Sequence, residues 1–283
     1  MRVPLSRSRI RRFSFALMCF LAAPAIPAVG DTLVIKPIAV QRGTAPEGGR
    51  YVLFGDASLD NARRVTFTAS LSRGQVGLFR AGRGGVEAFL LTGDEAPPDA
   101  GNNFNLLDEG ASNTRGDLAF LATVFSPSAA GVFVIRDGVI STIALTGRPA
   151  PTANAELFAT FDQIYLLASG EVYFGASLRG PPSSPIPAGR AIIRAGPSGV
   201  ESVIAPGDRY GGTREIASAL QFDVNESGEV TALVAVTDAD FFQPTDEVLE
   251  IVHLSGGRLS TLASVNAGVT GSGDLVRNLA ITF

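Results

Sequence analysis

The chain has 283 residues, of which 46% are hydrophobic, and it carries a formal net charge of −4. This length and composition suit one large domain or two small ones with a sizeable core. One histidine and one cysteine exclude a zinc site built from His and Cys, an H-E-x-x-H protease and a disulfide framework. The 32 glycines and 17 prolines, with no tryptophan, favour a turn-rich β protein.

The first thirty residues have the three-part pattern of a secretory signal peptide. Five arginines precede an apolar run over residues 13–23, and Ala28-Val29-Gly30 supplies small residues for cleavage. The alternative is a transmembrane anchor, but an apolar run of about eleven residues is too short to cross a bilayer as a helix. We therefore predict a signal peptide over residues 1–30, export to the periplasm or the extracellular space, and no stable membrane insertion of the mature chain.

Removal of residues 1–30 would take away five arginines and Cys19, leaving 18 basic and 27 acidic residues and a formal charge of −9. An acidic chain is a poor partner for nucleic acid or for an anionic membrane surface. Without a cysteine, the mature chain must also be held together by its core alone.

A short motif recurs along the chain. Residues 113–120 read N-x-x-G-x-x-A-F, and weaker copies occupy residues 60–67, 167–174 and 225–232. The copies end at residues 67, 120, 174 and 232, in steps of 53, 54 and 58 residues. So steady a period indicates a repeat architecture. Within each copy, Asn or Asp and Gly favour a turn, and the alternating apolar residues that follow favour a half-buried strand.

Each period predicts four short strands joined by glycine-rich turns, because Gly and Pro interrupt the apolar runs at regular intervals. The units are predicted over residues 65–107, 117–166, 171–222 and 229–283, and residues 32–40 and 51–54 add two further strands ahead of them. Unit two, with strands at 117–125, 131–135, 139–146 and 157–166, is the clearest.

Four-stranded antiparallel units at this period predict an all-β, β-propeller-like ring of four full units plus a half, with four or five blades. An open or stacked β-repeat array is the alternative. No Pro-, Ser- or Thr-rich linker divides residues 31–283, so we predict a single domain there.

Three features together suggest a known family: the N-x-x-G-x-x-A-F copies, segments such as GVFVIRDG (131–138) and LTGRPAP (145–151), and the export signal. In these the chain resembles the bacterial secreted tandem-repeat proteins of the choice-of-anchor type. The resemblance implies the fold and export but no activity. The chain departs from that pattern because it ends at Ile281-Thr282-Phe283 without an anchor helix or a basic tail, which predicts a released or a truncated protein.

No catalytic motif is present, since the chain lacks a G-x-S-x-G elbow and a phosphate-binding G-x-x-x-x-G-K-[ST] loop. His253 lies in a predicted strand, where a sheet residue is a simpler interpretation than a catalytic base. Residues 223–228 begin like a Ca²⁺ loop, but Val234 stands where the twelfth ligand should be, and the segment coincides with a repeat turn. Acidic residues in loops are the other Ca²⁺ candidates, and solvated loops are the simpler interpretation: Asp94, Glu95, Asp99, Asp238, Asp240, Asp246 and Glu247.

A candidate binding face follows from topology. In an up-and-down four-stranded unit, the loops after the first and third strands emerge at the same edge, and unit three has an insertion over residues 179–190 and unit four over residues 238–247. Since function tends to lie on loops held by a rigid scaffold, we predict a binding face there. Tolerated insertion is the alternative. The predicted residues are Arg179, Arg190, Asp238, Asp240, Phe241 and Phe242.

The sequence therefore predicts an exported, non-catalytic repeat protein that binds an extracellular protein or glycan and needs no cofactor. One alternative is a carboxylate-dependent glycan hydrolase or lyase on the same scaffold, which acidic groups of raised pKa around the axis would favour. The other is a structural component of the cell envelope.

Overall fold

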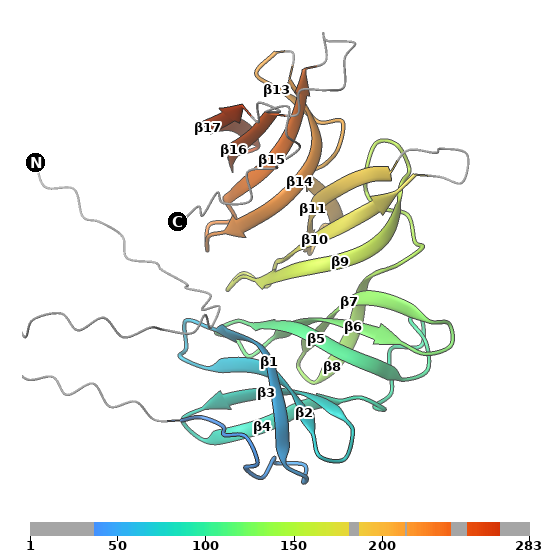
Figure 1. The fold of residues 1–283 in the computed structure, drawn as a ribbon, viewed down its shortest axis with the longest axis vertical. Helices are drawn as coiled ribbons and strands as arrows, with labels where there is room; N and C mark the ends of the chain where they lie inside the picture. The colour runs from blue at the N-terminus through green and yellow to red at the C-terminus, as the bar shows by residue number, and fades with distance from the viewer. Residues whose placement is uncertain (1–36, 181–186, 213, 239–247, 267–283) are drawn as a thin grey trace, which may run out of the picture.

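The computed structural model describes residues 37–180, 187–212, 214–238 and 248–266. Within these ranges the chain forms strands and turns, and no helix there is long and apolar enough to cross a membrane. The strands form four antiparallel sheets that follow one another face to face in chain order (Figure 1). This confirms the all-β fold with propeller-like blades.

Each sheet is one blade, numbered here in chain order. Blade 1 contains β1 (Tyr51–Leu59), β2 (Val65–Leu71), β3 (Val76–Gly82) and β4 (Gly85–Leu91). Blade 2 contains β5 (Phe104–Ser112), β6 (Leu118–Val124), β7 (Ala129–Arg136) and β8 (Val139–Leu145). Blade 3 contains β9 (Leu157–Leu166), β10 (Val172–Arg179), β11 (Pro187–Gly196) and β12 (Gly199–Ile204). Blade 4 contains the two-residue β13 (Arg209–Tyr210), then β14 (Arg214–Val224), β15 (Val230–Asp238), β16 (Val248–Ser255) and β17 (Arg258–Asn266).

The predicted grouping of strands into units was wrong by one strand. The strand at 104–107, assigned to the end of unit one, lies in β5, which pairs with β6 and so opens blade 2. Likewise the strand at 51–54 lies in β1 and completes blade 1. The physical reason is that the tight N-x-x-G turn joins two strands that are neighbours in one sheet. The longer loop that precedes the first of these two strands crosses over from the previous sheet. Residues 37–40 form no strand, and residues 32–36 and the predicted strand at 275–283 lie outside the described residues.

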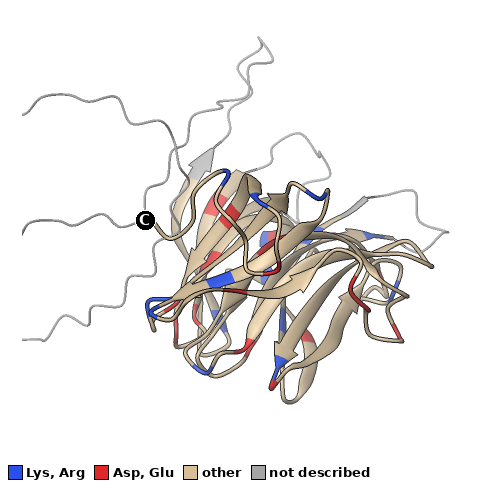
Figure 2. Ribbon diagram, turned by 90° about the horizontal axis from the view of Figure 1, so that it is seen from below, with Lys and Arg blue, Asp and Glu red and all other residues tan. Residues whose placement is uncertain are grey.

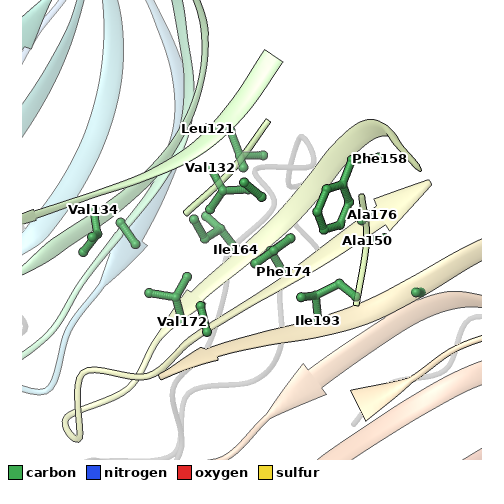
Figure 3. Close-up of a cluster of buried hydrophobic side chains, with 14 of the residues drawn as sticks. Leu121, Val132, Val134, Ala150, Phe158, Ile164, Val172, Phe174, Ala176 and Ile193 are labelled. Carbon is green, nitrogen blue, oxygen red and sulfur yellow. The ribbon is translucent and has the colours of Figure 1, made fainter. Parts of the chain in front are cut away.

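The core lies between successive blades rather than within them. Between blades 2 and 3, Leu121 and Val132 lie opposite Ile164, Phe174 and Phe158 (Figure 3). Because both faces of a middle blade are covered, β6, β7 and β10 are nearly continuous apolar runs. Phe174 is completely buried, and burial of one such side chain contributes about 1.5–3 kcal/mol.

The N-x-x-G turn joins two strands of one blade and also contacts the preceding blade. Asn113 Oδ1 accepts hydrogen bonds from the amides of Arg115 (3.0 Å) and Asp117 (3.1 Å), and Gly116 adopts a φ of +100°. The carbonyl of Gly116 accepts a 3.0 Å hydrogen bond from Arg80 Nη1 in blade 1.

The following turns repeat this arrangement with other donors. Arg136 of blade 2 donates to Gly170 O (2.6 Å), and the Tyr173 hydroxyl of blade 3 donates to Gly228 O (3.4 Å). The repeated motif therefore encodes a turn and a blade-to-blade contact together.

The loops divide into two edges. The tight turns after the first and third long strands of each blade form one edge, called here the turn edge. The connections after the second long strand and those between blades form the opposite, loop edge (Figure 1). At the turn edge, Asn61 Nδ2 of blade 1 donates to Glu226 Oε1 of blade 4 at 2.7 Å, and Glu226 Oε2 accepts from the Ala168 amide of blade 3 at 3.1 Å. Blades far apart in sequence therefore meet there.

Candidate functional site

Four strands, called here the inner strands, bring the blades together: β1, β5, β9 and β14. β1 contacts β5, and β5 contacts β9. The Tyr165 hydroxyl on β9 donates a 2.8 Å hydrogen bond to Phe222 O on β14. At the turn edge the four strands enclose a cavity of about 50 Å³, lined in part by Ser58, Ser112 and Tyr165. A ligand site shared by all four blades would involve these strands.

Every inner strand has a β-bulge at the same place. The pairing of β1 with β2 shifts in register between Phe54 and Ala57, and the pairing of β5 with β6 shifts between Leu107 and Gly110. β9 has Gln163 as the extra residue, and β14 has Leu220. A bulge interrupts the ladder and re-aims side chains, and bulges often occur next to functional sites.

Equivalent positions at these bulges carry hydrogen-bonding side chains. In all four blades, the residue four places before the tight turn that follows the inner strand is an acid or an amide. We call these residues the bulge set: Asp56, Glu109, Gln163 and Gln221. Asp56 and Gln221 are exposed, and Glu109 and Gln163 are half-buried. The preceding positions in two blades add the carboxylates of Asp108 and Asp162.

Apolar side chains lie among these polar groups. Leu53 of β1, Leu106 of β5 and Leu220 of β14 are 67%, 45% and 43% exposed. Exposed leucines beside carboxylates and amides provide both apolar contact and directional hydrogen bonding, a combination common in ligand sites.

Arg190 orders one side of the site. Its guanidinium forms an ion pair with Asp162 and donates to Gln163 Oε1 (2.7 Å) and Ala219 O (2.7 Å). It also lies 5.7 Å from the centroid of the Phe222 ring. The side chain of Arg190 is only 11% exposed, whereas that of Asp162 is 49% exposed. Arg190 therefore holds β9 against β14 and fixes two polar groups of the bulge region.

Gly175 makes this arrangement possible. It pairs with Asp162 across the sheet, and a Cβ at Gly175 would lie 2.1 Å from Arg190 Nη2 and 2.2 Å from Asp162 Oδ1. Only glycine leaves room there for the ion pair.

Several groups with shifted pKa values lie outside the bulge region. Burial raises the pKa of Asp208, whose carboxylate accepts a 2.7 Å hydrogen bond from the Ala205 amide in the loop after β12. Burial also raises the pKa of Tyr210. The Tyr210 hydroxyl donates at 2.7 Å to Glu250, a fully buried carboxylate that also pairs with Arg214. These groups stabilise blade 4 and its entry loop.

The predicted binding face lies at the loop edge. Arg179 is the last residue of β10 and is exposed, and Arg190 is directed into the contact between blades 3 and 4. Asp238 is the last residue of β15, and Asp240, Phe241 and Phe242 lie outside the described residues. Among the predicted residues within the described ranges, Arg190 is the one that contacts the bulge set, through Gln163.

The predicted Ca²⁺ candidates have structural contacts. Asn225 Oδ1 accepts from the amides of Ser227 and Glu229, each at 3.0 Å, as in the turn of blade 2. Asp94 Oδ2 accepts from the Leu91 amide at 2.7 Å, and Asp99 pairs with Arg148 at 3.4 Å. Across the part of the chain that the structure describes, no group of three or more His, Cys, Asp or Glu residues could hold a metal ion.

His253 is half-buried on β16, and its Nδ1 lies 3.2 Å from Thr231 Oγ1. This strand position and this contact agree with its interpretation as a sheet residue.

Sequence reasoning did not identify the bulge set, although a signal was present. Counting back four residues from Asp60, Asn113, Leu167 and Asn225 reaches an acid or an amide each time. The N-x-x-G-x-x-A-F motif covers only the turn and the strand after it, whereas the bulge set lies on the strand before it.

Comparisons with known proteins give a family but no activity. A model described as a family of unknown function (DUF7453) matches residues 25–249. No curated protein matches the chain.

Among solved structures, an ulvan lyase of polysaccharide lyase family PL25 is similar, with 10% identity and a TM-score of 0.38 over 75% of this chain and 56% of the lyase. The α-L-arabinanase of Penicillium chrysogenum has 12% identity and a TM-score of 0.37 over 83% and 72% of the two chains. The GH93 α-L-arabinofuranosidase of Fusarium graminearum has 8% identity and a TM-score of 0.37 over 74% and 64%.

Proposed function

The chain belongs to a family of unknown function, DUF7453, and we propose that it is an exported, non-catalytic propeller-like protein whose inner strands bind a neutral glycan. The observation that carries the proposal is the bulge set, in which four blades each contribute an acid or an amide from the same position of a bulged strand. Export rests on the signal peptide predicted over residues 1–30.

The side chains of the bulge set suit hydroxyl-rich ligands. Carboxylates accept hydrogen bonds, and amides both donate and accept them, so together they match sugar hydroxyls, which do both. The exposed leucines Leu53 and Leu106 offer apolar surface to the C–H faces of a sugar ring. An acidic glycan is disfavoured at this place, because Asp56, Asp108 and Asp162 would repel it.

The direct test is calorimetric titration of the exported protein with a panel of neutral oligosaccharides built from glucose, mannose, arabinose or xylose. We expect at least one to bind, and Asp56→Ala and Gln221→Ala each to weaken that binding by roughly tenfold, since one lost hydrogen bond to a buried ligand group costs about 1.4 kcal/mol or more. Glu47→Ala, which removes an exposed carboxylate from the turn before β1, is the control and should leave the affinity unchanged. The proposal fails if no neutral oligosaccharide binds, or if both site variants bind as tightly as the native protein.

Incubation of the protein with an oligosaccharide that it binds tests the hydrolase or lyase alternative. Asp108 and Glu109 are adjacent in one bulge, and Asp162 lies in the next inner strand, so these carboxylates are the groups that such an enzyme would use. Chromatography of the oligosaccharide after incubation should show it intact. Shorter products that disappear with Asp108→Asn would replace the non-catalytic proposal with the enzymatic one.

A further inference from the structure

A second concave region lies at the turn edge between blades 1 and 2, away from the bulges. It consists of two adjoining hollows of about 390 and 430 Å³ that share Arg80 and Glu87. The first is also lined by Arg64 and Arg83 and by the glycines of the β3–β4 hairpin. The second is also lined by Phe89, Arg115 and Gly116 and by the carboxylates of Asp117 and Asp137. Three arginines and a single acid therefore line the first hollow.

Arg64 is held rigidly at the back of the first hollow. Its Nε donates to Asp60 Oδ2 at 2.7 Å, and its Nη2 donates to the carbonyl of Asn113 in blade 2. The side chain of Asp60 is 1% exposed and that of Arg64 is 22% exposed. Among the described residues, Nη1 of Arg64 has no hydrogen-bond acceptor, so two N–H groups remain for a ligand.

Arg80 is fixed in a similar way. Its Nε and Nη2 both contact Glu87 Oε1 at 2.8 Å, its Nη1 donates to Gly116 O at 3.0 Å, and its guanidinium carbon lies 4.3 Å above the Phe89 ring. With its side chain 15% exposed, this guanidinium retains one N–H on each terminal nitrogen beyond the bonds described.

The two guanidinium groups converge beside Gly116. A Cβ at Gly116 would lie 3.6 Å from Arg80 Nη1 and 3.8 Å from Arg64 Nη1. Glycine thus leaves a niche toward which nitrogens of two guanidinium groups converge, next to Asp117 in the chain. Arg83, which is exposed in the hairpin between β3 and β4, adds a third cation at the rim.

This niche contrasts with the rest of the surface. Basic and acidic residues are mixed over the strands and turns of the molecule (Figure 2), so the surface as a whole does not concentrate anions. The local excess of arginine and the fixed guanidinium geometry are what select a ligand, because guanidinium groups hydrogen-bond oxyanions at two points.

We propose that Arg64, Arg80 and Arg83 form a binding site for a single oxyanion group, the carboxylate or sulfate ester of an acidic glycan. The site is separate from the bulge set and takes an anionic ligand instead of a neutral one. It stands whether or not the inner strands bind a neutral glycan. Occupancy would also join blades 1 and 2, since Arg64 and Arg80 belong to blade 1 and both contact the turn of blade 2.

The experiment is a titration of the exported protein with sodium glucuronate and, separately, with sodium sulfate, at low constant ionic strength balanced with chloride. Amide NMR shifts are recorded, and we expect saturable shifts at Gly116 and in the 82–85 hairpin. Glucuronate and sulfate curves that differ in affinity identify which oxyanion is preferred, and free phosphate serves as a third probe. Chloride alone should produce no saturation.

Two variants and a matched control decide the assignment. Arg83→Ala removes an exposed side chain and should weaken binding at least fivefold without loss of folding. Arg64→Lys should weaken binding further, because lysine keeps the positive charge but cannot donate two parallel hydrogen bonds to an oxyanion as a guanidinium group does. Arg258→Ala, an exposed arginine in the corresponding hairpin of blade 4, should leave binding unchanged. Absence of saturation at Gly116 with every oxyanion would overturn the proposal, and so would an equal loss in Arg258→Ala and Arg83→Ala.

Discussion

Replacement of Arg190 by alanine should destabilise the protein more than loss of any surface ion pair. Arg190 lies between blades 3 and 4, where its guanidinium contacts Asp162, Gln163 Oε1 and Ala219 O. Alanine would remove all three contacts and leave the carbonyl of the fully buried Ala219 without this donor. An unsatisfied buried carbonyl costs about 1–3 kcal/mol.

The individual contributions differ in weight. The ion pair with Asp162 is screened, because the side chain of Asp162 is 49% exposed, and such a pair contributes roughly 0–1 kcal/mol. The hydrogen bonds to Gln163 and Ala219 and the packing of the Arg190 stem beside Phe222 supply the rest. We therefore expect Arg190→Ala to lower the free energy of unfolding by about 2–4 kcal/mol.

Urea unfolding followed by circular dichroism measures this change. Asp162→Asn should cost less than about 1 kcal/mol, because it removes only the screened charge. Arg148→Ala is the matched control: it breaks the pair with Asp99, in which both side chains are about half exposed, and should cost less than about 1 kcal/mol. A loss below about 1 kcal/mol in Arg190→Ala, or an equal loss in Arg148→Ala, would refute the reasoning.

Two further predictions concern the turns. Gly170→Ala should lower the urea midpoint slightly more than Gly138→Ala. Both residues have positive φ, at +90° and +77°, but a Cβ at Gly170 would overlap Arg115 Nη2 and displace it from its 2.8 Å pair with Asp117, whereas Gly138 faces open space; equal midpoints would contradict this. The pKa of Asp117 lies below its ordinary value, because hydrogen bonds from Asn113 and Arg115 and the charge of Arg115 outweigh the opposing effect of burial. Its contribution to stability is therefore complete above the unfolded-state pKa and is lost as pH falls through the lower folded-state pKa. Asp117→Asn should accordingly flatten the acid side of the stability profile measured by urea unfolding between pH 2 and 7, and an unchanged profile would count against it.

The repeat and its turn chemistry were readable from sequence, but the pairing of strands was not. The N-x-x-G copies predicted the turns because Asn and Gly act locally, as the hydrogen bonds of Asn113 and the φ of Gly116 show. Which strands become neighbours depends on contacts between distant parts of the chain, and the connections within a blade and between blades both contain glycine. If the tightest turns are assumed to join strands that pair with each other, the strand at residues 104–107 is correctly placed beside the strand at residues 118–124.

The candidate site was less accessible from sequence. An acid or amide recurs four residues before each repeated turn, but a bulge arises from a mismatch between two strands, and that pattern alone does not indicate one. The exposure of Asp56 and Gln221 was therefore not predictable. The niche beside Gly116 is still harder to foresee, because it joins Arg64 and Arg80 to a turn more than thirty residues away. The Asp162–Arg190 pair likewise spans two strands that only the tertiary structure brings together.

The bulges have a consequence for how such a protein changes over evolutionary time. The two exposed members of the bulge set, Asp56 and Gln221, lie outside the core between blades, so replacement of their side chains leaves the packing that holds the sheets intact. They belong to different blades and lie on separate segments of the chain. Substitutions can therefore accumulate at one blade at a time, and chains with the same turns and the same cores can diverge in what they recognise.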